Sequence, residues 1–485
     1  MPHNGFDLAA SAREEMIEHG FDPDFPPGTG AQLASIRKRT VPAPDASIED
    51  VRGLLWSSID NDTSRDLDQI EYAERVASGI RLRIGIADVD SDVDRATPID
   101  KHASDQTTTV YTAVRNFPML PEELSTGLTS LNENQDRAAV IIELVVAADG
   151  SVGESRIYRA LVRNKAQLSY EGTGPWLEGR ADAPPKVAAS AELQAQLRLQ
   201  DEAAGALRQR RHELGALDFD RSEPFAVLAD GHVKDVKASH KNRASALIED
   251  FMVAANGVMA RTLSEAQVSA IRRVVKSPER WPRIVDLARE CGTELPPEPD
   301  SAALAAFLQS RQKADPVHYP DLSLAIIKLM GPGEYVLLRP GDPVLGHFGL
   351  AAHDYTHSTA PNRRFADLVT QRLIKAVLAK AHTPYTDDEL NSIARNCTAK
   401  EDAARHVERK MGKRVAAVAL DHRVGQGFTA VVTGVTPKGV FVRVPNPPVE
   451  GMLVRGEHGV DVGDEIRVTL VATDPRRGYI DFART

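Results

Sequence analysis

The sequence is poor in the residues that stabilise small secreted proteins or anchor a chain in a membrane. Its 485 residues include only two cysteines, Cys291 and Cys397, which are far apart, so neither a disulfide framework nor a paired-ligand zinc site is indicated. No stretch reaches the roughly 18 apolar residues of a membrane span, and the first residues, MPHNGFDLAASAREEM, lack the apolar core of a signal peptide. We therefore expect a cytoplasmic protein without a membrane partner.

Two further absences narrow the class of protein. No period of about 20 to 50 residues repeats, which excludes solenoids and propellers. The formal net charge is -10, which argues against a protein that coats nucleic acid by overall charge, although a local basic groove can exist in an acidic protein. What is present is an ordinary globular composition with 42% hydrophobic and 26% charged residues, long enough for two or three domains.

The hydrophobic patterns predict an α+β protein with a separate C-terminal barrel. Strand patterns such as IRLRIGIADVD and AAVIIELVVAADG precede helical ones such as ALIEDFMVAANGVMARTL and RRFADLVTQRLIKAVLAK, as in a mixed domain. The last segment has short strands broken by Gly, Pro and Asp, which is typical of a five-stranded OB-fold β-barrel. We predict four parts: a short helical N-terminal accessory segment (1–46), a mixed main domain (47–382), a helical connection packed on it (383–423) and the barrel (424–485).

One short stretch, SSIDNDTSRDLDQIEYAE, concentrates aspartates at alternating positions: Asp60, Asp62, Asp66 and Asp68. An extended chain presents such pairs on one face, and a cluster of hard oxygen ligands favours Mg²⁺ or Mn²⁺. The spacing also matches an EF-hand loop, but Arg65 stands where the turn needs Gly, and VRGLLWSSI before it does not read as a helix. A solvated acidic loop is the remaining alternative.

A second stretch, THSTAPNRRFADLVTQRLIKAVL, predicts a helix that begins with two cations. Ser358 or Thr359 would cap it, and Pro361 suits its first turn. Arg363 and Arg364 would then oppose the helix dipole, unless an anion such as phosphate occupies the N-terminus. Alternatively, one arginine pairs with a neighbouring acidic residue. The upstream HDYTH resembles a zinc motif, but the proline that follows makes one continuous helix through both histidines improbable.

These motifs resemble the RNase II family of 3′-to-5′ exoribonucleases, the RNB-domain enzymes. The similarity runs from about Leu54 to the C-terminus and rests on several blocks in the family's order: SIDNDTSRDLDQI, IGIADV, VYTAVRNFPMLPEELSTGLTSL, GALDFD, LIEDFMVAANG and GHFGLAAHDYTHSTAPNRRFADL. The last sixty residues are similar to the OB-fold RNA-binding domain that ribosomal proteins share with these nucleases. The resemblance thus implies an RNB catalytic domain followed by an RNA-binding barrel.

The resemblance also implies roles for individual residues. The matching positions would be Asp60, Asp66 and Asp68 for the catalytic Mg²⁺ (Mn²⁺ being an alternative), Arg363 for the scissile phosphate with Arg364 beside it, Tyr111, Tyr170 and Phe219 for the terminal bases, and Glu249 for the terminal nucleotides. Aromatic side chains that stack on bases contribute roughly 1–3 kcal/mol per base without reading sequence. Taken alone, each of these aromatics would be expected in a core.

The expected activity is processive hydrolysis of single-stranded RNA from its 3′ end, with metal-assisted attack of water releasing nucleoside 5′-monophosphates. No obligate protein partner is indicated. Two departures qualify this expectation. Gln69 stands where the family has a fourth aspartate, so metal affinity should fall unless Asp62 or a relocated group compensates. The alternative is a catalytically weak or inactive RNA-binding or regulatory protein. The short N-terminal segment is too small for the family's cold-shock barrels, so the RNA entrance should be less covered.

For the C-terminal barrel we consider two interpretations. Basic and aromatic side chains could form a groove for single strands, the candidates being Arg443, Arg455, Arg467, Arg476 and Arg477 with Phe428, Phe441 or Phe482 as stacking platforms. In the other interpretation the barrel is a docked cap, with most of these aromatics in its core.

Overall fold

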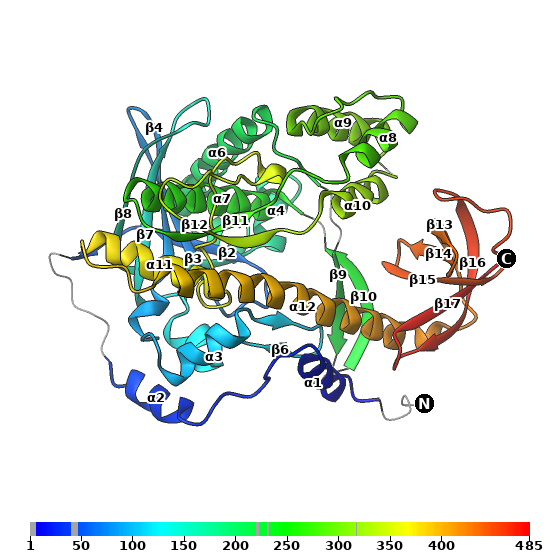
Figure 1. Ribbon diagram of the computed structural model, residues 1–485, viewed down its shortest axis with the longest axis horizontal. Helices are drawn as coiled ribbons and strands as arrows, with labels where there is room; N and C mark the ends of the chain where they lie inside the picture. The colour runs from blue at the N-terminus through cyan, green and yellow to red at the C-terminus, as the bar shows by residue number, and fades with distance from the viewer. Residues whose placement is uncertain (1–5, 40–46, 220–222, 230–231, 240, 317) are drawn as a thin grey trace.

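The computed structural model describes residues 6–39, 47–219, 223–229, 232–239, 241–316 and 318–485. A mixed sheet with helices packed against it forms the main body, and a small barrel lies at one end (Figure 1). The long helix α12 (Asp387–Leu420) runs across the molecule and reaches the barrel. The α+β class with a C-terminal barrel, as predicted from the sequence, is confirmed.

The main sheet has six strands in the order β1-β8-β2-β3-β4-β7. The strands are β1 (Ile48–Asp50), β2 (Trp56–Asp60), β3 (Gln69–Val76), β4 (Gly79–Ala87), β7 (Asp136–Val146) and β8 (Val152–Ser169). The long β8 pairs antiparallel with β7 along its first part and parallel with β2 along its last residues. Since Asp60 ends β2 and Gln69 begins β3, the predicted acidic stretch is the connection between two neighbouring strands.

The helices α6 (Ala191–Glu213), α7 (Arg243–Glu265) and α11 (Phe365–Leu378) bury apolar stripes in the same core as the sheet. Helix α7 begins at Asn242, which forms a capping box with Ser245. The remaining helices of the main body are α3 (Pro98–Gln106), α4 (Tyr170–Leu177) and α5 (Pro185–Ala188), with short helical turns at Val89–Ser91, Glu123–Leu128 and Phe348–Leu350.

Three small strand pairs complete the main body: β5 (Val110–Tyr111) with β6 (Asn116–Phe117), β9 (Glu223–Ala229) with β10 (His232–Ser239), and β11 (Ala270–Val274) with β12 (Glu334–Leu338). Between β11 and β12 the chain forms a helical insertion of α8 (Trp281–Glu290), α9 (Ser301–Ala314) and α10 (Tyr319–Met330). The insertion has a hydrophobic cluster of its own, separate from the main core.

The C-terminal strands form a closed barrel in the order β13-β14-β15-β17-β16. They are β13 (Gly427–Thr436), β14 (Gly439–Val444), β15 (Val449–Arg455), β16 (Glu465–Asp474) and β17 (Tyr479–Arg484), and a short turn, Asp421–Arg423, connects them to α12. Phe428 and Phe482 are buried in the barrel core, where their rings meet edge to face. The interpretation of these two rings as stacking platforms is therefore wrong, because closing so small a barrel requires their volume inside.

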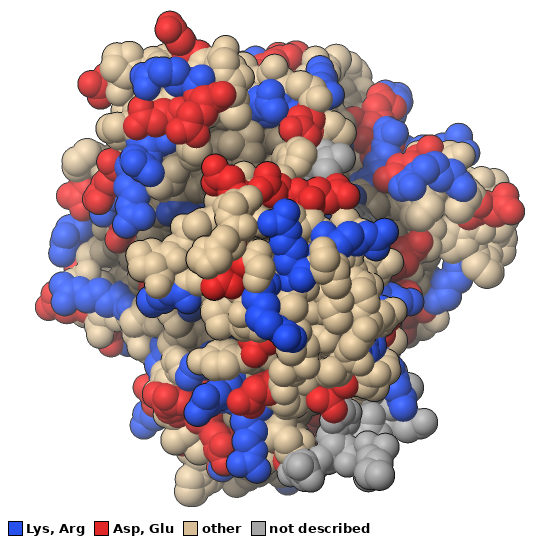
Figure 2. Space-filling view, turned by 90° about the vertical axis from the view of Figure 1, so that its right-hand side faces the viewer, with Lys and Arg blue, Asp and Glu red and all other residues tan. Residues whose placement is uncertain are grey.

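The barrel also contacts the helical insertion, since the Arg443 guanidinium forms an ion pair with Asp321 of α10 at 2.8 Å. Figure 2, which faces the barrel end of the molecule, shows basic and acidic side chains interspersed on this face. Both cysteines are free thiols. Within the described ranges, no helix combines the length and apolar character needed to cross a bilayer.

The N-terminal helix α1 (Leu8–Glu18) packs on α12 through a small hydrophobic cluster and an ion-pair network. Glu15 accepts from Lys410 at 2.8 Å and from Arg414 at 2.7 Å. A second short helix, α2 (Thr29–Ile36), contacts α3. The structure has a helix where the sequence predicts one, and the polar side of this helix anchors it to α12.

Candidate functional site

The acidic connection between β2 and β3 is a loop flanked by strands, which excludes the EF-hand interpretation because that site lies between two helices. Asp60 accepts hydrogen bonds from the Asn61 N–H at 2.7 Å and the Ser64 hydroxyl at 2.9 Å. Burial raises the pKa of Asp60. Asp62 is exposed at the tip of the loop.

Asp66 is paired with one of the predicted aromatic residues. The Tyr111 hydroxyl donates to Asp66 Oδ2 at 2.9 Å. Burial and, to a smaller extent, the charge of Asp66 raise the Tyr111 pKa, while 39% of the residue remains exposed. Tyr111 therefore lies at the aspartate loop with part of its surface open to solvent.

Asp68 is the most enclosed of the predicted aspartates. Its Oδ1 accepts from the Asn362 N–H at 3.0 Å, and its Oδ2 lies 3.7 Å from Arg363 Nε. Burial raises the pKa of Asp68 to about 7, although the Arg363 charge and the Asn362 hydrogen bond oppose that rise. The Arg363 side chain is 43% exposed. The partly exposed Arg363 guanidinium thus lies next to the buried Asp68 carboxylate.

The start predicted for the helix after the HDYTH segment, with a cap at Ser358 or Thr359, is wrong. Helix α11 begins at Phe365, with Arg364 in extended conformation at its N-cap. The segment before it pairs with residues 107–109: Thr109 N–H donates to the Arg363 carbonyl at 2.9 Å, and Phe365 N–H donates to the Thr107 carbonyl at 2.8 Å. These tertiary hydrogen bonds replace the helical ones, so neither arginine lies in the first turn.

The two neighbouring arginines have different partners. Arg364 donates to Asp367 at 2.7 Å, and its side chain is mostly buried. The charge of Asp367 raises the pKa of Arg364, although burial opposes that effect. The alternative in which one arginine pairs with an acidic neighbour therefore holds for Arg364, whereas Arg363 faces the aspartate loop.

The remaining predicted residues divide between the loop and other parts of the molecule. Tyr170 begins α4 half-buried, and its pKa is raised by burial, then by the charges of Asp60 and Glu71. Phe219 packs half-buried against the hydrophobic cluster of the helical insertion. Glu249 lies on α7 and forms an ion pair with Lys241 at 2.8 Å.

The structure also reveals a residue that the sequence interpretation missed. Glu71 follows Gln69 by two positions on β3 and is completely buried, and neither of its carboxylate oxygens has a hydrogen-bond partner among the described residues. Burial raises its pKa well above the ordinary value, and the charge of Asp60 raises it further. The signal in the sequence was a glutamate two positions after Gln69, and therefore on the same face of a strand that also carries several apolar residues.

The HDYTH segment is not a zinc motif. His357 lies outside any helix, and its Nδ1 is 2.8 Å from the Tyr335 hydroxyl. Burial lowers the pKa of His357, as do the nearby charges of Arg364 and Arg273. A neutral histidine packed between tyrosine rings is a structural feature of this region.

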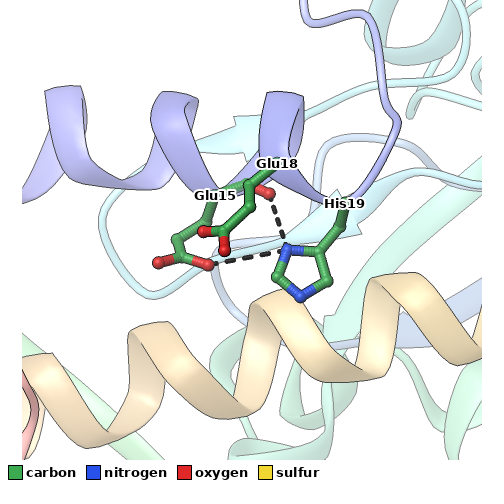
Figure 3. A group of neighbouring side chains, drawn as sticks. All are labelled: Glu15, Glu18 and His19. Carbon is green, nitrogen blue, oxygen red and sulfur yellow. Dashed lines mark hydrogen bonds and ion pairs between the residues drawn. The ribbon is translucent and has the colours of Figure 1, made fainter.

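Among the described residues, the one group of three His, Cys, Asp or Glu side chains with ligand atoms within 4.8 Å of one another is Glu15, Glu18 and His19 (Figure 3). Lys410 bonds both glutamates, and Glu15 also pairs with Arg414. This group is the anchor of α1 on α12. The aspartate loop does not converge to that degree, but its donor set consists of carboxylate oxygens with free lone pairs, which suits a hard divalent cation.

Comparison with known proteins supports the family resemblance. The RNB domain profile matches residues 48–380, and that of the RNase II-type exonuclease C-terminal S1 domain matches residues 426–485. Ribonuclease R of Escherichia coli is 30% identical over 453 residues, which cover 88% of this chain and 54% of that protein. The structure of Mycoplasma genitalium RNase R in complex with ribose methylated single-stranded RNA has a TM-score of 0.87 at 22% identity, covering 99% of this chain and 79% of that chain.

The chain belongs to the RNB-domain family, and its barrel is an S1 domain of the RNase II type. It spans little more than half the length of the Escherichia coli relative.

Proposed function

We propose that the protein is a hydrolytic 3′-to-5′ exoribonuclease that degrades single-stranded RNA processively to nucleoside 5′-monophosphates. The observation that carries this proposal is the half-exposed Arg363 over the buried Asp68, beside Asp60 and Asp66, in a chain of the RNB-domain family. The relatives named Ribonuclease R and the RNA-bound structure of the Mycoplasma genitalium enzyme support it.

Each residue has a role that follows from its position. Arg363 binds the scissile phosphate, because its guanidinium is accessible and is oriented by Asp68. Asn362 holds Asp68 through its backbone N–H, so the carboxylate cannot rotate away from the arginine without losing that bond. Tyr111, held by Asp66 and partly exposed, is available to a base, and Tyr170 is close enough to Asp60 for that charge to raise its pKa.

Mg²⁺, or alternatively Mn²⁺, is the cofactor that this donor set suits best. We propose Asp60, Asp66 and Asp68 as its ligands, with Asp62 and Gln69 as weaker candidates, since Asp62 is exposed and the Gln69 amide donates to the Ile59 carbonyl at 3.3 Å. When bound, such an ion supplies a Lewis acid that activates water and stabilises developing negative charge. The chain's own part is to position the phosphate at Arg363.

The direct test is a time course on a 5′-labelled single-stranded RNA with Mg²⁺, with Mn²⁺ and with chelator, alongside an RNA blocked at its 3′ end. Metal-dependent shortening to a small limit product, slowed by the 3′ block, is the expected result. Intact RNA with both metals, together with tight binding, would contradict the proposal. It would instead support the alternative of an RNA-binding or regulatory protein weakened by Gln69, which the retention of Asp60, Asp66, Asp68 and Arg363 does not favour.

A further inference from the structure

The buried Glu71, whose carboxylate has no hydrogen-bond partner among the described residues, is not explained by the roles given above. Its side chain has no exposed surface, and both carboxylate oxygens lack hydrogen-bond partners among the described residues. A buried polar group without a partner is costly, and a carboxylate more so than a neutral group. Its neighbours in register, Ser57 on β2 and Ile84 on β4, donate no hydrogen bond to it.

The position of Glu71 relates it to the aspartate loop. Side chains alternate along a strand, so Gln69 and Glu71 point to the same face of β3. The Gln69 amide reaches the Ile59 carbonyl, next to Asp60. Glu71 pairs in register with Ser57 of the neighbouring strand β2, and β2 ends at Asp60. The charge of Asp60 raises the pKa of Glu71, and the charges of both carboxylates raise the pKa of Tyr170, so the three groups are electrostatic neighbours.

We propose that Glu71 supplies the carboxylate that position 69 lacks, as a ligand of the divalent cation bound at Asp60 and the aspartate loop. This inference rests on the proposed function. The neutral Gln69 leaves the loop one charge short, and Glu71 restores that charge from the same face of the same strand, two residues away. A cation would also satisfy the two buried oxygens that the protein leaves unpaired.

Binding requires a change of side-chain rotamer, because no three carboxylates of the loop lie within 4.8 Å of one another in the described residues. The Glu71 side chain can make that change without losing a hydrogen bond, since its carboxylate forms none with the described residues. Asp60 and Asp68 are more constrained, as both already accept hydrogen bonds from neighbouring backbone N–H groups. Glu71 is therefore the carboxylate best able to move toward an incoming ion.

The test measures Mn²⁺ binding to the full metal-free chain by calorimetry and by the paramagnetic resonance signal of free Mn²⁺, without RNA. Glu71→Gln should weaken Mn²⁺ binding about tenfold or more. The control is Glu74→Gln, which removes a charge from the opposite face of β3, where Glu74 pairs with Arg81; it should bind Mn²⁺ like wild type. Adding Gln69→Asp to Glu71→Gln should restore the affinity.

Wild-type Mn²⁺ affinity in a folded Glu71→Gln variant would overturn the proposal, as would the absence of Mn²⁺ binding by the wild-type chain. Circular dichroism establishes whether the variant folds. If it does not, the single variant Gln69→Asp decides: its Mn²⁺ affinity should stay within about tenfold of wild type if Glu71 is already a ligand, and a larger gain would contradict that role.

The RNA time course separates this inference from the proposed function. Degradation of RNA by wild type together with unchanged Mn²⁺ binding by Glu71→Gln would leave the function standing and remove Glu71 from the site. Mn²⁺ binding that depends on Glu71, with no degradation of RNA, would leave a metal site in a protein that is not a nuclease.

Discussion

Two groups of carboxylates lie next to the central sheet, and they differ in whether nearby cations outweigh the effect of burial on the carboxylate pKa. In the first group, just after the end of β4, Lys375 forms ion pairs with Asp88 and Asp90 at 2.8 Å each, and Arg372 forms ion pairs with Asp90 and Asp100. Burial alone would raise the pKa of Asp88, but the Lys375 and Arg159 charges lower it below the ordinary value. We call Asp88, Asp90, Asp100, Arg159, Arg372 and Lys375 the paired network, in which three carboxylates are paired with three cations.

In the aspartate loop, by contrast, burial raises the pKa of Asp60 and Asp68 by more than the nearby charge and hydrogen bonds lower it. The pKa of Asp68 rises to about 7, and the carboxylate of Glu71 on the adjoining strand β3 has no hydrogen-bond partner among the described residues. Within the described residues, Arg363 is the one cation that forms an ion pair with a loop aspartate. The side chains of Asp60 and Asp66 accept their hydrogen bonds from neutral donors. Charge that is fully compensated from within stabilises a fold, whereas charge left uncompensated indicates a place for a ligand.

The largest expected effect comes from removing charge from the loop. Asp68→Asn should lower RNA cleavage by roughly 10²-fold or more, because it removes the carboxylate that orients Arg363, while RNA binding stays near wild type. Single-turnover cleavage and filter binding on one RNA measure the two effects. Cleavage at the wild-type rate would remove Asp68 from the catalytic site.

Breaking the paired network should affect stability instead. Lys375→Met leaves Asp88 and Asp90 without their shared cation, and losing one partner of a buried pair costs about 3–5 kcal/mol. Urea unfolding should show this loss, and the folded fraction at low temperature should cleave RNA at the wild-type rate. A loss of cleavage in a variant of full stability would mean that the network belongs to the site.

Acid should reduce the stability difference caused by Lys375→Met. In wild type, the folded pKa of Asp88 lies below its ordinary value of 3.8, so its contribution to stability is present above pH 3.8 and is lost only as the pH falls through the folded pKa. Without Lys375, burial raises the folded pKa, and the variant gains stability relative to its unfolded state on acidification. Unfolding curves between neutral pH and pH about 4 should therefore converge. A constant difference would argue against a charge effect.

The smallest expected effect concerns Tyr111. Tyr111→Phe removes the hydrogen bond to Asp66 but keeps the ring, so RNA binding should weaken by about 1 kcal/mol or less. Tyr111→Ala removes the ring and should weaken binding by roughly 1–3 kcal/mol if a base stacks there. Equal losses in both variants, measured by fluorescence anisotropy, would show that only the hydroxyl matters.

Local patterns were sufficient for much of the fold. The alternation in IRLRIGIADVD predicted β4, and the pattern RRFADLVTQRLIKAVLAK predicted a helix, which is α11 with Phe365, Leu368, Val369 and Leu373 buried. The cap of α11 could not be predicted in the same way. Ser358 donates to Asn256, and residues 363–365 pair with residues 107–109. Such distant partners leave no trace in a short sequence window, so the sequence could not show where the helix begins or which of the two arginines pairs with an acidic neighbour.

By itself, the sequence determined the order of the motifs, the type of each long element and the aspartates of the loop, because these depend on residue spacing along one strand or helix. Only the tertiary structure decided which charges are compensated. Arg364 is mostly buried against Asp367 whereas Arg363 is accessible, cations outweigh burial at Asp88 but not at Asp68, and the buried Glu71 carboxylate has no hydrogen-bond partner among the described residues. The physical reason is that burial and charge pairing depend on groups from distant segments, which meet only when the chain folds.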